Sequence, residues 1–247
     1  MDDGKTTVRA VDRALDLLLC FVEETDLGLT ELAARAGLHK STALRLLSSL
    51  ERKGFVIRNP VTDKYRLGYR ILELAAGAAQ PDDLSLVFLP EMERLRDQIG
   101  ETVSLYVRDG FERIRIQAVQ SREAVRRVAP VGARLPLYVG ASSKVLVAYA
   151  GERFIEEWRA GGNWPEGFQP DAFLAQMEQV RREGFATSFE EREPGVAAMA
   201  VPIIGRSGQL AAALSVSGPS SRLTPDVMKR HAGLLKEAAA RMGKLVR

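Results

Sequence analysis

The sequence contains very few of the side chains on which disulfide-linked, metal-binding and many catalytic proteins depend. Its 247 residues include a single cysteine, Cys20, so no disulfide can form within the chain and no thiolate cluster can hold a metal. Only two histidines are present, His39 and His231, which argues against a histidine-dependent triad and a multi-histidine metal site. No phosphate-binding loop or glycine-rich dinucleotide motif follows a predicted strand. We therefore expect no metal and no cofactor.

Long apolar runs are missing as well. The opening residues, MDDGKTTVRAVD, are polar and lack the apolar segment of a signal peptide. No stretch approaches the roughly 18 consecutive apolar residues that a membrane-spanning helix needs. Together with the shortage of cysteine, these features predict a cytoplasmic protein that does not bind membranes.

What the sequence does contain is typical of a globular protein. Hydrophobic residues make up 46% and charged residues 27%. The length exceeds the roughly 150 residues of an average domain, so we expect two domains. The formal net charge is only +3, which by itself argues weakly for a nucleic-acid partner.

The first 54 residues show the pattern of three short helices. A helix over 8–24 is predicted to bury one apolar face. The residues of that face are Val11, Ala14, Leu15, Leu18, Leu19 and Val22. Two further helices, over 30–36 and 39–53, are joined by a tight turn in which Gly37 can adopt the left-handed conformation, and Thr30 suits the N-cap of the first. This arrangement is typical of a helix-turn-helix.

A hairpin and a concentration of positive charge follow the last of these helices. Strands are predicted over 55–58 and 64–67, which gives a wing beside the helix-turn-helix. Between Arg35 and Arg70 there are nine basic and two acidic residues, a local charge of +7 that is typical of a DNA-binding surface. The alternative is an ordinary solvated helix face. The residues predicted to contact DNA are Arg9, Thr30, His39, Lys40, Ser41, Thr42, Arg45, Lys64, Tyr65 and Arg66.

The rest of the chain alternates helices and strands. An Ala-rich helix is expected over 68–79, where QPDD then ends it. Ser142 or Ser143 is predicted to cap a helix that runs to about residue 150. The other predicted helices are 84–99, 171–183 and 225–245, and the predicted strands are 102–107, 113–119, 125–129, 185–189, 197–204 and 210–217. We therefore expect an α+β domain with antiparallel strands.

Three glutamates near residue 190 are the only cluster that suggests acid–base chemistry. Glu190, Glu191 and Glu193 are close in sequence, but a solvated loop is the commoner meaning of such a run. Without a histidine or metal constellation, a binding role fits this domain better than catalysis.

With these motifs in view, the chain resembles the IclR family of transcriptional regulators over roughly residues 8–245. The matching segments are VRAVDRALDLL, LTELAARAGLHKSTALRLLSSLERKGFV, YRLGYRILELA, LPL at 135–137 with ASSK at 141–144, EGFATSFEEREPGVAAMAVPI and LSVSGPSSRLT. The family usually has a glycine before the lysine of ASSK and an aromatic-acidic pair at the end of the central strand. Here Ser143 and Ile204-Gly205 occupy these positions.

The resemblance implies a winged helix-turn-helix over 1–67, a linker helix and boundary over 68–83, and a GAF-like effector-binding and oligomerisation domain over 84–247. It further implies a homodimer or tetramer on a pseudo-palindromic operator, controlled by a small organic or aromatic acid. By the resemblance, the effector pocket consists of Ala124, Arg127, Ala141, Ser142, Ser188, Val196, Ala198, Ser215 and Ser217.

The chemistry and predicted positions of some of these residues independently favour binding of an acid. Ala141 and Ser142 lie at a predicted helix N-terminus, where backbone N–H groups favour a carboxylate. Ser215 and Ser217 face one side of a strand, and Arg127 or its neighbour Arg126 suits an ion pair with an acid. The alternative is that the serines are small packing residues and the arginines are solvated.

Three classes of function fit these observations. The first is a ligand-responsive DNA-binding repressor or activator. The second is an enzyme that carries a helix-turn-helix and converts a small acid, against which the missing catalytic constellation argues. The third is an architectural DNA-binding protein without an effector, which leaves the large second domain without a purpose.

Overall fold

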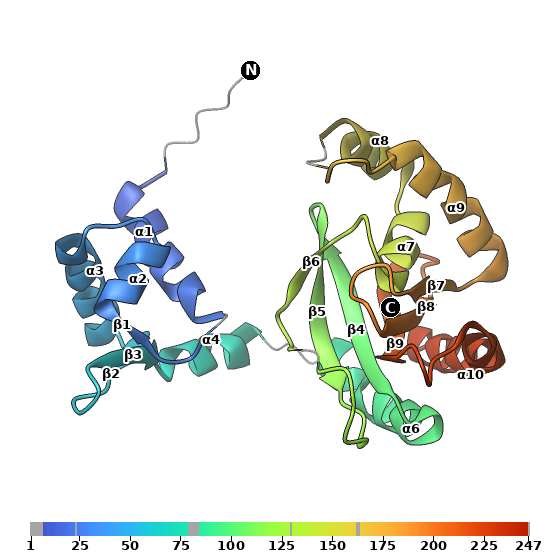
Figure 1. Ribbon diagram of the computed structural model, residues 1–247, viewed down its shortest axis with the longest axis horizontal. Helices are drawn as coiled ribbons and strands as arrows, with labels where there is room; N and C mark the ends of the chain where they lie inside the picture. The colour runs from blue at the N-terminus through green and yellow to red at the C-terminus, as the bar shows by residue number, and fades with distance from the viewer. Residues whose placement is uncertain (1–6, 23, 79–83, 129, 162–163, 247) are drawn as a thin grey trace. The chain divides into compact units, whose positions relative to one another are not determined.

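The structure is a computed structural model that describes residues 7–22, 24–78, 84–128, 130–161 and 164–246. The chain divides into two compact units, residues 1–81 and 82–247 (Figure 1). Residues 79–83 of the predicted linker lie outside the described residues. In the part of the chain that is described, no helix is long and apolar enough to cross a membrane.

The first unit is a winged helix-turn-helix, as the sequence predicts. Its elements are α1 (Arg9–Leu19), a 3-10 turn (Cys20–Val22), β1 (Leu27–Gly28), α2 (Leu29–Arg35), α3 (Lys40–Arg52), β2 (Val56–Arg58), β3 (Lys64–Leu67) and α4 (Arg70–Ala78). The strands form an antiparallel sheet in the order β1-β3-β2, in which β1 was not predicted. The hairpin β2-β3 is the wing.

The turn between α2 and α3 forms where it was expected. Gly37 has a φ of +63°, and the N–H of Leu38 donates to the carbonyl of Ala33 at 2.8 Å. The predicted N-cap is wrong, because α2 begins before Thr30. Gly28 is the N-cap, and its N–H donates to the carboxylate of Glu31 at 2.8 Å, so Thr30 lies exposed within the first turn.

The predicted buried face of α1 is also largely wrong. Leu17 and Phe21 are the residues of this segment that are fully buried in the core of the unit, and of the predicted face Leu18 packs against that core while half-buried. Much of the predicted face is exposed instead. Its exposed members, with exposed fractions of 52–69%, are Val11, Leu15, Leu19 and Val22. A stripe of apolar side chains on one side of α1 is therefore largely exposed and stays outside the core of the unit.

The second unit is an α+β domain built on one antiparallel sheet. Its helices are α5 (Leu84–Val87), α6 (Leu89–Ile99), α7 (Ala141–Ala148), α8 (Glu152–Gly161), α9 (Pro170–Glu183) and α10 (Pro225–Gly243). Its strands are β4 (Thr102–Asp109), β5 (Glu112–Val119), β6 (Arg134–Pro136), β7 (Ala186–Phe189), β8 (Val196–Ile204) and β9 (Leu210–Pro219). The order in the sheet is β6-β5-β4-β9-β8-β7, and β4 and β5 form a long hairpin (Figure 1).

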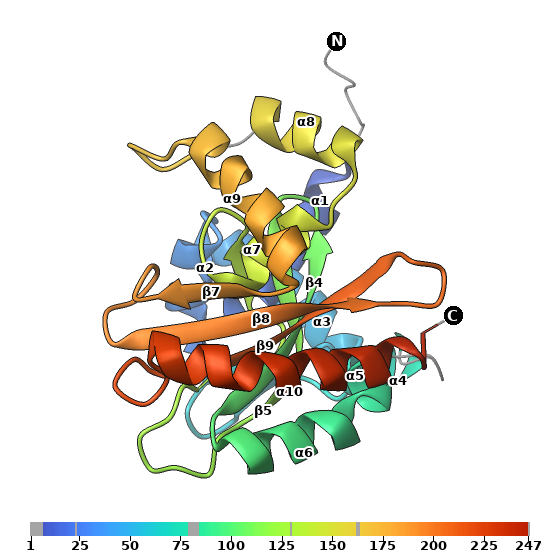
Figure 2. The same cartoon turned by 90° about the vertical axis from the view of Figure 1, so that its right-hand side faces the viewer.

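Helical layers cover both faces of this sheet. Apolar residues of α6 and α10 pack against one face, whereas α7, α8 and α9 share a second core with the other face (Figure 2). Because each face is covered, even a strand with alternating side chains is buried on both sides.

Several predictions for this unit are corrected by the structure. The helix predicted over 84–99 is divided into α5 and α6, since Pro90 cannot continue a helix and is tolerated only in the first turn of a new one. Residues 125–128 form an irregular loop instead of a strand, and residue 129 lies outside the described residues. Neither Ser142 nor Ser143 caps α7, because the helix begins at Ala141 with Gly140 as the N-cap. The elements β6 and α8 were not predicted.

Candidate nucleic-acid interface and ligand pocket

The exposed face of α3 carries the residues expected to contact DNA. Ala43 and Leu47 are buried in the core of the first unit, which fixes the rotation of the helix about its axis. The opposite face is therefore turned outward. His39 at the N-cap, Lys40, Ser41 and Arg45 are exposed, and Thr42 is half-buried.

A groove between α1 and α3 brings together residues that are far apart in the sequence. Arg9 of α1 lines this groove with Thr42 and Arg45 of α3. Arg13, one turn along α1 from Arg9, lies in the same groove and was not predicted. Three guanidinium groups thus gather beside the exposed face of α3, where they suit the phosphates of a DNA backbone.

The three wing residues predicted to contact DNA differ in exposure. Lys64 and Arg66 are exposed, but Tyr65 is only 2% exposed and belongs to the core of the unit. Successive side chains of a strand point to opposite faces, so Tyr65 faces inward when its neighbours face solvent. Burial raises the pKa of the Tyr65 hydroxyl. Tyr65 is therefore withdrawn from the DNA-contacting set.

In the second unit, a pocket lies between α7 and the sheet, with about 50 Å³ of internal free space, or about 470 Å³ when the open solvent at its mouth is counted. Eight of the nine predicted effector residues line it. These are Arg127, Ala141, Ser142, Ser188, Val196, Ala198, Ser215 and Ser217. Ala124 does not, because it is exposed in the loop after β5. Sequence reasoning missed six lining residues: Tyr106, Arg113, Arg115, Gly140, Arg192 and Glu193.

Small side chains in adjacent strands create the space beneath α7. Ser188 of β7 pairs with Ala198 of β8, which in turn pairs with Ser217 of β9. Partners in one row of an antiparallel sheet project from the same face, so these three neighbouring positions present only small side chains to the pocket. The buried hydroxyl of Ser215 donates to the carbonyl of Met199 at 3.0 Å.

Two buried arginines of β5 form one wall of the pocket. Arg113 and Arg115 are each 3% exposed. Arg113 donates to the carbonyls of Pro136 and Val139, at 3.0 and 2.6 Å, and to the hydroxyl of Ser143. Burial, opposed by Tyr106 and reinforced by the positive charge of Arg192 and Arg115, lowers the pKa of Arg113 to about 10.

Arg115 is held by a neighbouring strand. Its Nε donates to the hydroxyl of Tyr106 at 2.9 Å, and its Nη1 donates to the carbonyl of Pro130 at 3.2 Å. All partners of Arg113 and Arg115 in the described part of the chain are uncharged oxygens. The positive charges on this wall are therefore not neutralised by the protein.

The glutamates near residue 190 act as partners of basic residues around the pocket. Glu193 binds Arg127 through both of its oxygens, at 2.9 and 2.8 Å, and also pairs with Arg192 at 2.5 Å. Glu191 pairs with Lys144 at 2.5 Å. Glu190 accepts a hydrogen bond from Ser220 at 2.6 Å. Since each carboxylate has a partner, the cluster does not resemble an acid–base pair.

The N-terminus of α7 opens toward the pocket. The N–H of Gly140 donates to Glu191 at 3.3 Å, so one of the groups expected to bind a carboxylate is already used. Within the described residues, the backbone N–H groups of Ala141 and Ser142 have no acceptor, and both residues line the pocket. These two groups remain available to an anion.

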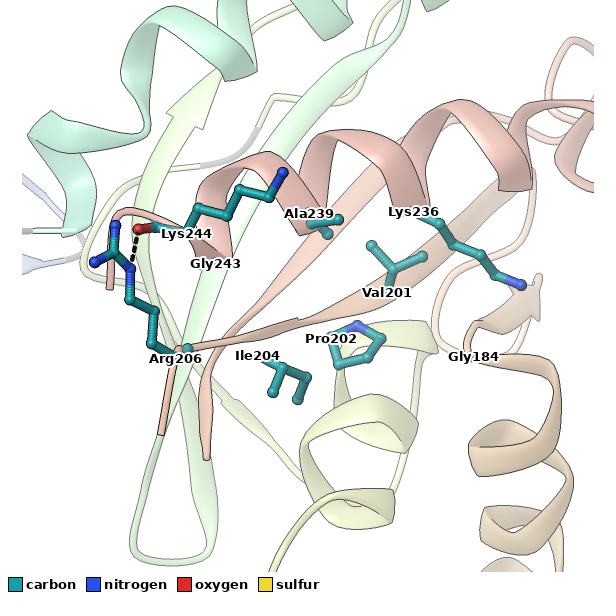
Figure 3. Close-up of a pocket in the computed structure, with 11 residues that line it drawn as sticks. Gly184, Val201, Pro202, Ile204, Arg206, Lys236, Ala239, Gly243 and Lys244 are labelled. Carbon is teal, nitrogen blue, oxygen red and sulfur yellow. Dashed lines mark hydrogen bonds between the residues drawn. The ribbon is translucent and has the colours of Figure 1, made fainter. Parts of the chain in front are cut away.

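A second hollow lies between α10 and the end of β8 (Figure 3). Its apolar floor contains Val201, Pro202 and Ile204, and Arg206 donates to the carbonyl of Lys244 at 2.7 Å at its edge. It encloses about 780 Å³ with its open side. Its larger volume does not make it the better site, because none of its described lining residues has a buried side-chain polar atom without a hydrogen-bond partner. The described residues also contain no group of three or more histidine, cysteine or acidic side chains suited to a metal.

Comparison with known protein families assigns the chain to a family. The family model described as "Bacterial transcriptional regulator IclR C-terminal" matches residues 76–243, and the one described as "IclR helix-turn-helix domain" matches residues 10–60. The chain belongs to the IclR family. IclR-family members are transcriptional regulators, so this protein is a DNA-binding transcriptional regulator and not an enzyme.

Individual members of the IclR family match nearly the whole chain. The HTH-type transcriptional regulator XynR of Escherichia coli K12 is 32% identical over 226 residues, which cover 87% of this chain and 88% of XynR. The HTH-type regulator KdgR of the same organism is 29% identical, covering 98% of this chain and 94% of KdgR.

Solved structures of the IclR family share the fold. An IclR regulator from Alicyclobacillus acidocaldarius is 28% identical with a TM-score of 0.81, covering 98% of this chain and 100% of its own. An IclR homologue from Microbacterium hydrocarbonoxydans, solved in complex with 4-hydroxybenzoate, is 29% identical with a TM-score of 0.83, covering 96% of this chain and 99% of its own. The predicted fold class, a winged helix-turn-helix followed by an α+β effector-type domain, is confirmed.

Proposed function

We propose that the protein represses or activates transcription under the control of a small organic or aromatic acid of a catabolic pathway, which binds between α7 and the sheet. The carrying observation is that Arg113 and Arg115 are buried in this pocket and make no ion pair with any described residue. Burying a charge without a counter-charge is costly, and a bound carboxylate would relieve that cost. The relative solved with 4-hydroxybenzoate supports an acid as the ligand.

In this proposal the two units have separate tasks. Residues 1–67 bind DNA and add a contact between copies, 68–83 form the linker, and 84–247 bind the effector and oligomerise. The exposed end of α3 enters the major groove with Lys40, Ser41, Thr42 and Arg45 as the contacting residues. Lys64 and Arg66 of the wing contact the DNA backbone or minor groove. Arg9 contacts a phosphate, and His39 and Thr30 stay in the set as exposed residues beside this surface.

A homodimer or tetramer is part of the proposal. The exposed stripe on α1 is apolar, and an exposed apolar stripe on a helix is typical of a protein–protein contact. Two copies joined in this way present two recognition helices to the half-sites of a pseudo-palindromic operator. An effector that binds one arrangement of the two copies more tightly than another would then change operator affinity.

The proposal is tested with the full chain, its candidate operator in the adjacent intergenic region and a panel of small acids. An acid that binds should raise the melting temperature and change operator affinity in a fluorescence anisotropy titration. Arg127→Gln should weaken the effect of the acid, whereas Arg126→Gln should not, because Arg126 is exposed and lies outside the pocket lining. An acid that binds without changing operator affinity in any variant would contradict effector control.

A further inference from the structure

The charges around the pocket are unbalanced. Four guanidinium groups line it, those of Arg113, Arg115, Arg127 and Arg192, and the only carboxylate among the lining residues is that of Glu193. Lys144 and Glu191, which lie beside the N-terminus of α7, pair with each other and leave this excess unchanged. The lining residues therefore carry three more positive than negative charges.

The excess positive charge of the pocket lies at two sites with different surroundings. At the inner wall, Arg113 is nearly fully buried, and its Nε has no hydrogen-bond partner among the described residues. The free N–H groups of Ala141 and Ser142 face the same pocket. A buried guanidinium with an unpaired donor, beside a helix N-terminus, is a site prepared for one carboxylate.

At the second place, the protein already supplies a carboxylate. Glu193 bridges Arg127 and Arg192, with a bidentate contact to Arg127. Its side chain is 40% exposed, and it lies in the loop 190–195 between β7 and β8. Because Glu193 is close to solvent, its carboxylate can be returned to water at low cost. Arg127 and Arg192 can therefore exchange Glu193 for another anion.

From this geometry we propose that the effector is a small dicarboxylate. One carboxylate binds Arg113 and the N-terminus of α7, and the other replaces Glu193 between Arg127 and Arg192. This inference rests on the proposed function and specifies its ligand class. A monocarboxylate fills the inner place only and leaves Glu193 on the two arginines, whereas a dicarboxylate releases Glu193 from Arg127 and Arg192.

The experiment compares acids that differ only in the second charge, using the full chain and isothermal titration calorimetry. Malonate, succinate, glutarate, adipate and terephthalate are each measured beside the matching monoamide, in which an uncharged amide replaces one carboxylate. The best dicarboxylate should bind about 30-fold more tightly than its monoamide, since the amide leaves the second pair of arginines without a new anion.

Three variants test whether the preference for a dicarboxylate over its monoamide arises at Arg127 and Arg192. Glu193→Gln removes the competing carboxylate, and we expect it to raise dicarboxylate affinity about tenfold while leaving monoamide affinity unchanged. Arg127→Gln and Arg192→Gln should remove most of the 30-fold preference. Arg126→Gln, the exposed neighbour, is the matched control and should keep it. These side chains are partly exposed, so the variants should fold even if a substitution of Arg113 does not.

The outcomes separate this inference from the proposed function. Equal binding of dicarboxylates and monoamides, or an equal gain for both in Glu193→Gln, overturns the two-carboxylate arrangement and leaves an acid-controlled regulator in place. If neither class binds while the protein still binds its operator, the proposed function itself fails.

Discussion

At the residue scale, the most informative positions are charged side chains that are buried and apolar side chains beside them that are more exposed. Arg113 and Arg115 alternate with isoleucines along β5, yet the arginines are buried and Ile114 is only half-buried. Arg115 faces Tyr106 across the strand pair, next to an irregularity in the register between Leu105 and Tyr106. Alternation alone predicts a strand but does not say which face is inward when helices cover both. The arginine wall therefore follows from tertiary structure and not from the pattern.

Substitution of Arg45 tests the proposed contact between α3 and the bases of the operator. Arg45→Ala should weaken specific operator binding by about 1–3 kcal/mol if the side chain contacts a base edge, with a smaller effect on unrelated DNA. Anisotropy titrations with operator and non-operator duplexes measure both values. Arg153→Ala serves as the control. Arg153 is exposed on α8, and its substitution removes the same positive charge from the other unit. An unchanged operator footprint in Arg45→Ala would remove Arg45 from the contact set.

Neighbouring residues of the wing should separate stability from DNA binding. Tyr65→Ala removes a buried aromatic ring and should lower the free energy of unfolding by about 3–5 kcal/mol. Lys64→Ala changes an exposed side chain, so its stability should stay within about 0.5 kcal/mol of the parent while its DNA affinity falls. Urea unfolding and anisotropy distinguish the two. A stable Tyr65→Ala protein with weakened DNA binding would return Tyr65 to the interface.

At the element scale, one close contact positions the last helix on the sheet. Gly243 in the last turn of α10 lies so near β8 that a Cβ there would be 2.1 Å from the carbonyl oxygen of Ile204 (Figure 3). That oxygen belongs to the backbone and cannot move aside as a flexible side chain does. The end of α10 therefore requires a residue without a side chain at this position.

Two glycines of α10 should respond in opposite directions to alanine. Gly243→Ala forces α10 away from β8 and should destabilise the protein by about 1–3 kcal/mol. Gly233→Ala meets no atom within 4 Å and is exposed, so it should stabilise by about 0.5–1 kcal/mol through helix propensity. Thermal unfolding of both variants measures the difference. A Gly243→Ala protein as stable as Gly233→Ala would show that the close approach is not required.

Elements could be predicted where a local signal specifies them. Gly37 marked the end of α2, alternation located β4 and β5, and the turn at Ser207-Gly208 separated β8 from β9, because these signals act within a few residues. The short strands β1 and β6 have too few residues to show a pattern and exist only because β3 and β5 pair with them. Eight pocket residues were predicted from the family resemblance, whereas the ion pair between Arg127 and Glu193 joins side chains 66 residues apart and has no local signal in the sequence.

At the scale of the whole molecule, averages conceal how the chain is organised. The net charge of +3 hides a charge of +7 between Arg35 and Arg70, which lies in the DNA-binding unit. Hydrophobicity shows the same effect, since the apolar face of α1 satisfies a helical pattern but is not covered by its own unit. The residues that this helical spacing selects are therefore exposed within one chain, and in the proposed homo-oligomer they are the candidate contact with a second copy.

The apolar stripe on α1 can be tested as the contact between copies. The double substitution Leu15→Glu and Leu19→Glu places charges on the exposed stripe of α1, where each side chain is more than half exposed, so the fold of the unit should survive. Light scattering should then show a smaller assembly than the parent protein, and operator affinity should fall because two half-sites are no longer bound by linked copies. Leu245→Glu, at an exposed leucine near the end of the chain, is the control and should leave the assembly unchanged. If the double variant keeps both the parent's mass and its operator affinity, the stripe is not the contact between copies.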